Sequence, residues 1–416
     1  MSSLAISGAL LAGERVGLRA DGGYIVELGP EVRPREGDEV LEAGGELLVP
    51  PFVNAHGHSA MTLFRGFGDD LPLMQWLEEK IWPAEAKLEP SDVYWGARLA
   101  CIEMVRSGTT RFFDIYWHGP EVARAAEDAG LRVVASAVLL DHLNPGGGAR
   151  LRFAAMESLD ALAAAGPLVE AALGPHAIYT VSRQSLEWIA EVSSSRSLGV
   201  QIHLSETEAE VSDCLEANGV RPAFYLDGLG LLGPRTMLAH GVWLDFSELE
   251  LIAERGATVA TNPAANMKLA VGGSFPYPAA AAAGVQIALG TDGVSSNNNL
   301  DMFEEVKLLA LLAKHAAADP SVLPASEALE IARGRRSELA GGTPLKPGAP
   351  ADFLLLDGEL PELSAGDPDA GLVYSANGSV VQTAVVAGRV VMHNRAVEGE
   401  AEVRAEVSER AARLTH

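Results

Sequence analysis

The sequence predicts an α/β protein: a (β/α)8 TIM barrel joined to a small β-sandwich domain that is built from both ends of the chain. Three observations support this prediction. Eight short apolar runs recur through the middle of the chain, and segments with helical spacing separate most of them. The segment 53–342, which holds all of these runs except the start of the first, fits the usual barrel size of about 250 residues. Both ends of the chain instead carry short β-like runs punctuated by glycine.

Each apolar run in the middle of the chain ends at a polar or glycine-rich turn, which is typical of a buried parallel strand. Alanine- and leucine-rich segments such as 91–108 and 152–166 lie between the runs and predict helices, and 278–284 predicts another. We predict the eight strands within these ranges: 47–58, 110–117, 133–140, 169–176, 199–206, 236–241, 257–263 and 285–292.

The two ends of the chain predict the second domain. Residues 4–30 share their pattern of short β-like runs with 351–357 and 380–397. We expect these segments to meet in one sandwich; the alternative is that they are extra strands around the barrel. Residues 398–416 predict a closing amphipathic helix. The expected domains are 1–52 for the first part of the sandwich, 53–342 for the barrel, and 343–416 for the rest of the sandwich and the closing helix.

Composition restricts the partners and the location. A formal net charge of −25 over 416 residues makes nucleic acid a poor partner for the surface as a whole. The two cysteines, Cys101 and Cys214, form no CxxC motif, which excludes a structural zinc knuckle and a thioredoxin-type motif. No basic leader precedes the first apolar run, and no apolar stretch approaches the about 18 residues of a membrane helix. We therefore expect a cytoplasmic protein without a membrane partner.

Two histidines one residue apart, His56 and His58, follow the first apolar run. In an extended strand, side chains at i and i+2 point to the same face, so both imidazoles could reach one metal ion. The pair alone is weak support, because a short HxH is common. The rest of the chain must supply the other ligands.

Further polar residues stand where other predicted strands end: His176 in the fourth run, His203 and Glu206 in the fifth, His240 in the sixth and Asp292 in the eighth. A barrel enzyme builds its site from the C-terminal ends of its strands. One histidine in a β-run is more often a hydrogen-bonded core residue than a ligand, but several beside an aspartate at one barrel mouth favour a catalytic metal site. Imidazole and carboxylate suit zinc, which lowers the pKa of bound water to about 7.

Eight motifs occur in order along the chain: HGHSAMTLFRG, GPHAIY, IHLSET, LAHGVWL, TNPAANMKL, LGTDGVSSNNNLDMF, GAPADFLLLD and VVAGRVV. Together they resemble the amidohydrolase superfamily, in the branch that holds the S-adenosylhomocysteine and methylthioadenosine deaminases and the chlorotriazine hydrolases. The resemblance runs from about residue 47 to 310 and returns near the C-terminus.

The resemblance implies one divalent metal ion per chain, zinc before iron. It implies four ligands for that ion: His56, His58, His203 and Asp292. His240 would hold the attacking water. Superfamily members with two metals carry a bridging lysine at the fourth strand, whereas residues 151–200 contain no lysine, which favours a single ion.

The implied reaction is hydrolytic removal of ammonia from an aminated heterocycle, foremost an adenosine-type nucleoside. Asp292 would take a proton from the attacking water while His240 orients it. Glu206 would protonate the neighbouring ring nitrogen, and such general acid–base help is worth roughly 10²- to 10⁴-fold. The alternative for Glu206 is a helix-start carboxylate, because ETEAEVSDCLEANG follows. The other zinc deaminase signature, HxE with PCxxC, is absent from the sequence.

Substrate contacts are also implied by the resemblance. Glu85 would take the ribose hydroxyls and His176 would contact the base. Trp76 or Trp82 could form an apolar wall, although buried packing is at least as good an interpretation for either side chain.

Arg150 matches an arginine that can meet the amino-acid carboxylate of a larger nucleoside in the family. A second arginine expected in the third run is absent, and Ser136 lies nearest that position. Serine cannot replace the guanidinium fork, which weakens S-adenosylhomocysteine as the substrate.

Other interpretations stay open at this point. The same site could displace chloride or an amine from a triazine, or deaminate a free base of the guanine or pterin kind. A metal-binding homologue without catalysis is a third interpretation, which the complete set of proton-handling residues argues against. Relatives often pair, so a homo-oligomer is expected.

Overall fold

The computed structural model describes residues 3–142 and 146–415; His416, the last residue of the predicted third domain, lies outside them. Eight parallel strands follow one another in chain order around one sheet, as predicted. The Ala55 amide donates to the Leu289 carbonyl at 2.9 Å, which joins the two edges and closes the barrel. The strands are β6 (Phe52–Asn54), β7 (Thr109–Asp114), β8 (Arg132–Leu139), β9 (Val169–Pro175), β10 (Gly199–Leu204), β11 (Thr236–His240), β12 (Thr258–Thr261) and β13 (Gln286–Leu289).

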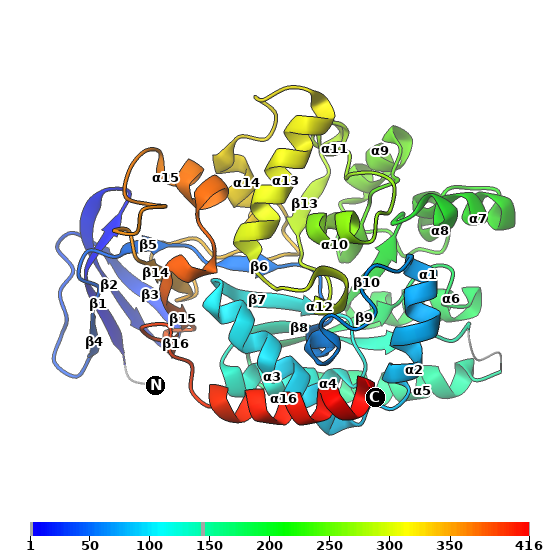
Figure 1. Ribbon diagram of the computed structural model, residues 1–416, viewed down its shortest axis with the longest axis horizontal. Coiled ribbons are helices and arrows are strands. Elements are labelled where there is room, and N and C mark those ends of the chain that lie inside the picture. Colours follow the sequence, from blue (N-terminus) through cyan, green and yellow to red (C-terminus); the bar gives the residue numbers. More distant parts are fainter. Residues whose placement is uncertain (1–2, 143–145, 416) are drawn as a thin grey trace.

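Helices surround the barrel (Figure 1) and bury their apolar sides against it. The three helices expected from spacing are present as α3, α5 and α11. Helix α3 begins with a capping box in which the Glu89 and Asp92 side chains accept each other's backbone amides. The barrel helices are α3 (Pro90–Arg106), α4 (Gly119–Ala129), α5 (Gly148–Ala163), α6 (Arg183–Arg196), α7 (Glu208–Asn218), α8 (Pro222–Gly228), α9 (Phe246–Arg255), α10 (Pro263–Lys268), α11 (Tyr277–Ala283), α12 (Val294–Asn297), α13 (Met302–Ala317) and α14 (Ala325–Ala332).

A second, mixed sheet lies at one end of the molecule and takes strands from both termini, which confirms the predicted sandwich (Figure 1). Strand β14 runs antiparallel to β5 and so joins the two ends of the chain. The core of this terminal sheet includes Leu18, Ile25 and Phe353, all fully buried. The strands are β1 (Leu4–Leu11), β2 (Glu14–Asp21), β3 (Tyr24–Gly29), β4 (Glu39–Glu42), β5 (Leu47–Val49), β14 (Phe353–Leu356), β15 (Val381–Val386) and β16 (Arg389–Met392).

The closing helix α16 (Glu400–Thr415) lies along the barrel rather than on the terminal sheet (Figure 1). It packs against α3, and the Arg413 guanidinium donates to the buried Asp92 carboxylate at 2.5 Å. The remaining short elements of the C-terminal segment are α15 (Pro368–Ala370), η3 (Gly371–Ser375) and η4 (Gly378–Val380).

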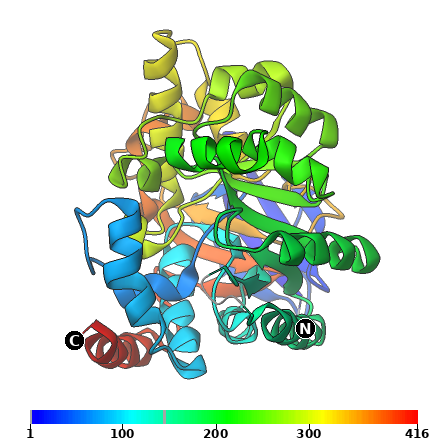
Figure 2. The same ribbon diagram turned by 90° about the vertical axis from the view of Figure 1, so that its right-hand side faces the viewer.

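A long connection between β6 and α3 covers one side of the mouth of the barrel, which faces the viewer in Figure 2. Short helices make up this cover: η1 (Ser59–Phe64), α1 (Leu73–Trp76), η2 (Leu77–Ile81) and α2 (Trp82–Glu85).

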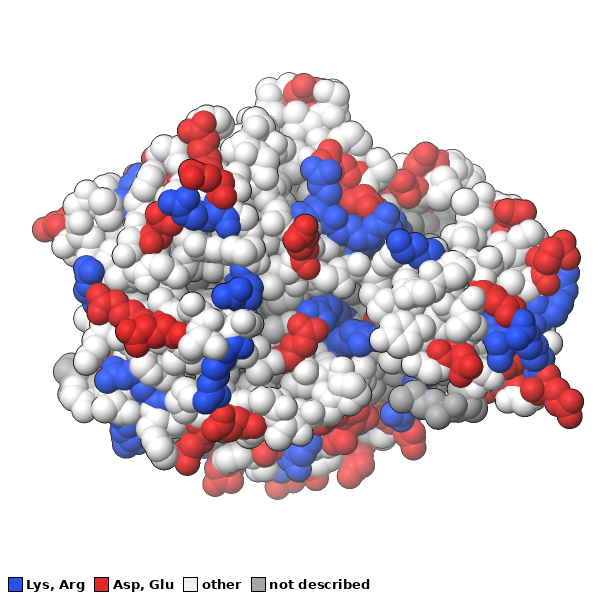
Figure 3. Space-filling view, turned by 180° about the vertical axis from the view of Figure 1, so that it is seen from behind, with Lys and Arg blue, Asp and Glu red and all other residues white. Residues whose placement is uncertain are grey.

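Charged side chains of both signs are mixed on the surface. On the described residues of the face in Figure 3, lysines and arginines are interspersed with acidic side chains and form no continuous basic stripe. None of the described helices combines the length and apolarity that crossing a membrane requires.

Candidate active site

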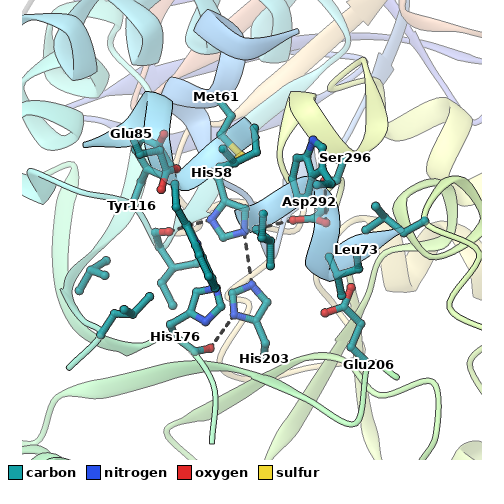
Figure 4. Close-up of a pocket in the computed structure, with 18 of the residues that line it drawn as sticks. His58, Met61, Leu73, Glu85, Tyr116, His176, His203, Glu206, Asp292 and Ser296 are labelled. Atoms are coloured by element: carbon teal, nitrogen blue, oxygen red, sulfur yellow. Dashed lines mark hydrogen bonds and ion pairs between the residues drawn. The ribbon is translucent and has the colours of Figure 1, made fainter. Parts of the chain in front are cut away.

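Four histidines and an aspartate converge at the C-terminal ends of the barrel strands (Figure 4 shows part of the group). His56 and His58 follow β6, His203 lies in β10, His240 ends β11 and Asp292 follows β13. The Nε2 atom of His58 lies 3.1 Å from Oδ1 of Asp292 and 3.3 Å from Nε2 of His203. The Nε2 atom of His56 lies 3.6 Å from the same carboxylate oxygen. Side chains from four strands therefore surround one point.

Backbone carbonyls fix the tautomers of two of these rings. Nδ1 of His58 donates to the Ile115 carbonyl at 2.7 Å, and Nδ1 of His203 donates to the His176 carbonyl at 2.6 Å. In each neutral ring, Nε2 then carries the lone pair. Two lone pairs that face each other, next to the buried and unpartnered Nε2 of His56, fit a cation between them.

The pKa shifts of His56, His203 and Asp292 agree with a cation site, whereas His58 differs. Burial lowers the pKa of His58, but the adjacent Asp292 carboxylate outweighs burial and raises it to about 9, so this ring must give up a proton when a cation binds. Burial lowers the pKa of His56 to about 4 and that of His176 to about 3, and it holds the pKa of His203 well below its usual value. Burial opposes the ionisation of Asp292, but the two histidines beside it outweigh burial and hold the pKa of its carboxyl well below the ordinary range. Neutral imidazoles and a carboxylate are the forms that bind a metal.

His240 belongs to this group but has a different set of contacts. Its Nδ1 donates to Oδ1 of Asn266 at 2.8 Å, and Oε1 of Glu206 lies 3.9 Å from the same nitrogen. His240 and Asp292 both have left-handed backbones, with φ of 74° and 62°. Strained backbone of this kind persists at sites where the surroundings over-determine the geometry.

Glu206 lies between β10 and α7 and faces the cavity (Figure 4). The N-cap of α7 is Thr207, whose hydroxyl accepts the Glu210 amide, so the Glu206 side chain does not cap this helix. Glu206 is 6% exposed, and burial raises the pKa of its carboxyl.

The cavity in front of these residues is walled by aromatic side chains. Oε2 of Glu85 accepts from Nε1 of Trp117 at 3.0 Å, and burial raises the pKa of Glu85. His176 also lines the cavity, and its Nδ1 lies 2.9 Å from the Thr180 hydroxyl. The structure brings both expected tryptophans to this wall, together with other aromatic and aliphatic side chains: Leu73, Trp76, Leu77, Ile81, Trp82, Tyr116 and Tyr179.

Comparison with known proteins decides the family. The sequence model of one protein family, described as the amidohydrolase family, matches residues 47–391 of the chain. The chain belongs to the amidohydrolase family.

Named relatives of this amidohydrolase are similar over nearly the whole chain. A 5'-deoxyadenosine deaminase of Methanoregula boonei is 45% identical over 401 residues, which cover 94% of this chain and 90% of the relative. A 5-methylthioadenosine/S-adenosylhomocysteine deaminase of Syntrophobacter fumaroxidans is 43% identical and is aligned over 94% of this chain and 93% of its own.

Solved structures agree with the fold of the amidohydrolase. An adenosine deaminase from Xanthomonas campestris with bound zinc has a TM-score of 0.90 and 32% identity, over 99% of this chain and 98% of its own. An atrazine chlorohydrolase from Arthrobacter aurescens has a TM-score of 0.88 at 22% identity, over 98% of this chain and 100% of its own, which supports the fold alone. With the histidine and aspartate cluster, these comparisons identify a site for a divalent metal ion.

Two residues singled out from the sequence lie away from the cavity of the amidohydrolase. Arg150 is exposed on the first turn of α5 and does not line the cavity. Ser136 is buried inside the barrel, where its hydroxyl accepts from Gln201 Nε2 at 2.8 Å. The β8 side of the cavity is formed instead by Val138 and Leu140, which follow Ser136 toward the mouth.

Several residues of the site received no role from the sequence. Asn266 and Ser296 lie in quoted motifs, and the Ser296 hydroxyl donates to Oδ2 of Asp292 at 2.8 Å. Trp117 stands at the end of the second predicted strand, and Tyr179 follows His176 by three residues. The rule that strand ends form the barrel site could have suggested these last two.

Proposed function

We propose that this amidohydrolase is a metal-dependent deaminase that releases ammonia from an adenosine-type nucleoside. The observation that carries the proposal is the buried arrangement of Glu206, His240 and Asp292 around one cavity, with the cation site beside it. Removal of an amino group needs both a proton acceptor and a proton donor. The relatives named as nucleoside deaminases support the same reaction.

The ion would be held by four side chains: His56, His58, His203 and Asp292. We propose one ion per chain, and zinc before iron, because this donor set suits zinc. When bound, such an ion acts as a Lewis acid and lowers the pKa of water to about 7.

His240 would orient the attacking water. Its Nδ1 proton is engaged by Asn266, so Nε2 is the atom left to accept a hydrogen bond from water. Asp292, ionised at neutral pH, would accept the proton that the water loses. Its Oδ2 is held by the Ser296 hydroxyl, which fixes the carboxylate plane.

Glu206 would donate a proton to the ring nitrogen next to the carbon that carries the amino group. Its raised pKa keeps the carboxyl protonated to a higher pH than in an exposed glutamate. Protonation of the nitrogen makes the neighbouring carbon electrophilic. The amine would leave as ammonia with the proton held by Asp292, and Glu206 would regain a proton from the hydroxyl that becomes the product carbonyl.

The cavity also suggests which nucleoside fits. Glu85 would bind the ribose hydroxyls and His176 the base. A second hollow adjoins the first at Glu85, and its walls carry no lysine or arginine among the described residues. It has mostly apolar walls, among them Trp82, Trp117, Val138, Leu140, Leu151 and Ala154. We therefore propose an uncharged 5'-substituent, as in 5'-deoxyadenosine or methylthioadenosine.

The deciding experiment measures ammonia release by metal-loaded protein with 5'-deoxyadenosine, methylthioadenosine, adenosine, S-adenosylhomocysteine, guanine, melamine and a chlorotriazine. We expect the highest kcat/KM with the first two compounds. Preference for S-adenosylhomocysteine would contradict the apolar 5'-site and would return Arg150 to consideration as its carboxylate partner. Turnover of only a free base or a triazine would refute the nucleoside substrate while keeping the hydrolase.

A further inference from the structure

The turn that carries Glu206 has an unusual backbone. Ser205, the residue before it, is fully buried and has a φ of 51°, in the left-handed region that favours glycine. A serine keeps this conformation only where its surroundings hold it. The contacts around this one peptide therefore decide where the Glu206 side chain points.

The carboxylate of Glu210 holds this turn from one side. Its Oε1 accepts the Ser205 amide at 2.8 Å, and its Oε2 accepts the Glu206 amide at 2.9 Å. Glu210 is 5% exposed and does not line the cavity. It lies in the first turn of α7, where the helix dipole favours a negative charge, while burial raises the pKa of its carboxyl to about 7.

The loop that follows His240 holds the turn from the other side. The Trp243 amide donates to the Ser205 carbonyl at 2.8 Å, and the Gly241 amide donates to the Leu204 carbonyl at 3.0 Å. Ser205 is thus fixed at its N–H by a side chain and at its carbonyl by the loop next to His240. This arrangement sets the position of the Glu206 carboxyl relative to His240.

We propose that Glu210 is the positioning residue for Glu206, holding the strained turn in the one geometry that aims the Glu206 carboxyl into the cavity. The inference rests on the proposed function, in which Glu206 moves the protons. Both oxygens of Glu210 are used as acceptors. A glutamine in its place would have one acceptor oxygen and one NH2 group. The NH2 group would face a backbone N–H, and because both are donors, one of the two hydrogen bonds would be lost.

The test is a double-mutant cycle of Glu210→Gln with Glu206→Gln, measured as kcat and KM on the best substrate. Glu210→Gln alone should lower kcat by at least about 10-fold, with KM and metal content close to the original values. In the Glu206→Gln background, the same change should lower kcat by less than about 3-fold, because the group it positions is already lost. Equal losses in both backgrounds would refute the positioning role.

Glu248 supplies a control in a similar position. It is a fully buried glutamate in the first turn of α9, and its carboxylate accepts the backbone amides of Ala223 and Asp245. It differs from Glu210 in that it also accepts from Nε of Arg221 at 2.7 Å, and this guanidinium donates to the Trp243 carbonyl at 2.6 Å. Glu248 does not line the cavity. Glu248→Gln should lower the melting temperature and leave kcat unchanged, whereas an equal fall of kcat in both variants would mean that Glu210 acts only through stability.

Two further outcomes separate this inference from the proposed function. A normal kcat in Glu206→Gln would refute the proton role of Glu206 itself. A large loss in Glu206→Gln with a normal kcat in Glu210→Gln would refute only the positioning role. Should Glu210→Gln fail to fold, Glu210→Asp, which keeps both acceptor oxygens on a shorter side chain, takes its place in the same cycle.

Discussion

The imidazole of His240 and the side-chain amide of Asn266 form a hydrogen bond of 2.8 Å between Nδ1 and Oδ1, and both side chains are buried. An amide oxygen can only accept, so the proton of the neutral ring must stand on Nδ1. Nε2 is left with a lone pair. Asn266 thereby selects the tautomer that can hold the attacking water.

Replacement of Asn266 tests this tautomer assignment. Asn266→Ala should lower kcat about 10- to 100-fold, because the ring loses both its orientation and its preferred tautomer. Metal content should stay unchanged. Steady-state kinetics and metal analysis check both statements, with Asn266→Asp as the control that keeps an acceptor oxygen and should lose less. A normal kcat in Asn266→Ala would contradict the role of His240.

Glu206→Gln should keep its metal and its fold but lose at least about 100-fold in kcat. The glutamine fills the same volume and removes only the proton that the carboxyl can donate. Single-turnover measurement of ammonia release, beside metal analysis, separates lost chemistry from slow product release. Near-normal release would remove Glu206 from the mechanism.

The positions of the metal-site and catalytic residues were predictable from the sequence wherever a residue ends a predicted strand. His203, His240 and Asp292 each end an apolar run, and a barrel places such residues at its mouth. The histidine pair was placed less well: β6 ends at Asn54, whose amide donates to the Thr291 hydroxyl at 2.7 Å, so the two histidines lie in the loop that follows. The homo-oligomeric state and the cytoplasmic location stay predictions.

Contacts made by long connections were not predictable. Whether Trp76 and Trp82 face substrate or only core depends on how the cover between β6 and α3 folds back over the mouth. Ser136 shows the same limit of prediction. The sequence places it nearest the position of an expected substrate-binding arginine, whereas in the structure it lies inside the barrel. Side chains two residues apart in a strand share one face, so Ser136 and Val138 both point into the barrel, but only Val138 lies close enough to the mouth to line the cavity.

Removal of the metal should abolish ammonia release and lower the melting temperature, because an ion that binds only the native state stabilises it. Metal analysis should find about one ion per chain, because the histidine and aspartate side chains converge on one point. His56→Ala should bind less metal, whereas His118→Ala, a histidine at the start of α4 outside the cluster, should bind the normal amount. Two ions per chain would contradict the single site.

Asp141 should make stability depend on acid pH. Its carboxylate accepts from the Ser182 amide at 2.6 Å, the Ser182 hydroxyl at 2.7 Å and the Ser185 hydroxyl at 2.6 Å. Burial raises the pKa of Asp141, but these donors outweigh it and hold the pKa below the ordinary 3.8. A depressed pKa gives stability that is present above pH 3.8 and is lost as the pH falls through the folded-state value.

The variant Asp141→Asn should therefore unfold at lower urea concentration than the original protein at pH 7, and the difference should shrink below pH 3.8. Urea unfolding at several pH values measures it. Asp213→Asn, at an exposed position, serves as the control and should show no such trend. A difference that grows toward low pH would mean that the sign is wrong.

Lys268 ties the cover of the cavity to the barrel. Its Nζ donates to Oδ1 of Asp69 at 2.7 Å and to Oδ1 of Asn298 at 2.8 Å. Asp69 stands just after Gly66 and Gly68, both with left-handed backbones, in the cover that carries much of the cavity wall. The ion pair is partly exposed, so its effect should be modest and sensitive to salt.

Asp69→Asn should raise KM about 2- to 5-fold and leave kcat within a factor of about 2, because a partly exposed ion pair contributes at most about 1 kcal/mol. The cover would open more readily, which weakens substrate binding without touching the groups that move protons. Kinetics at low and high salt check this: salt should raise KM in the original protein and have little effect in the variant. Glu121→Gln, which breaks a surface pair with Arg124 on α4, controls for lost charge and should leave KM unchanged. An unchanged KM in Asp69→Asn would show that this ion pair does not hold the cover closed.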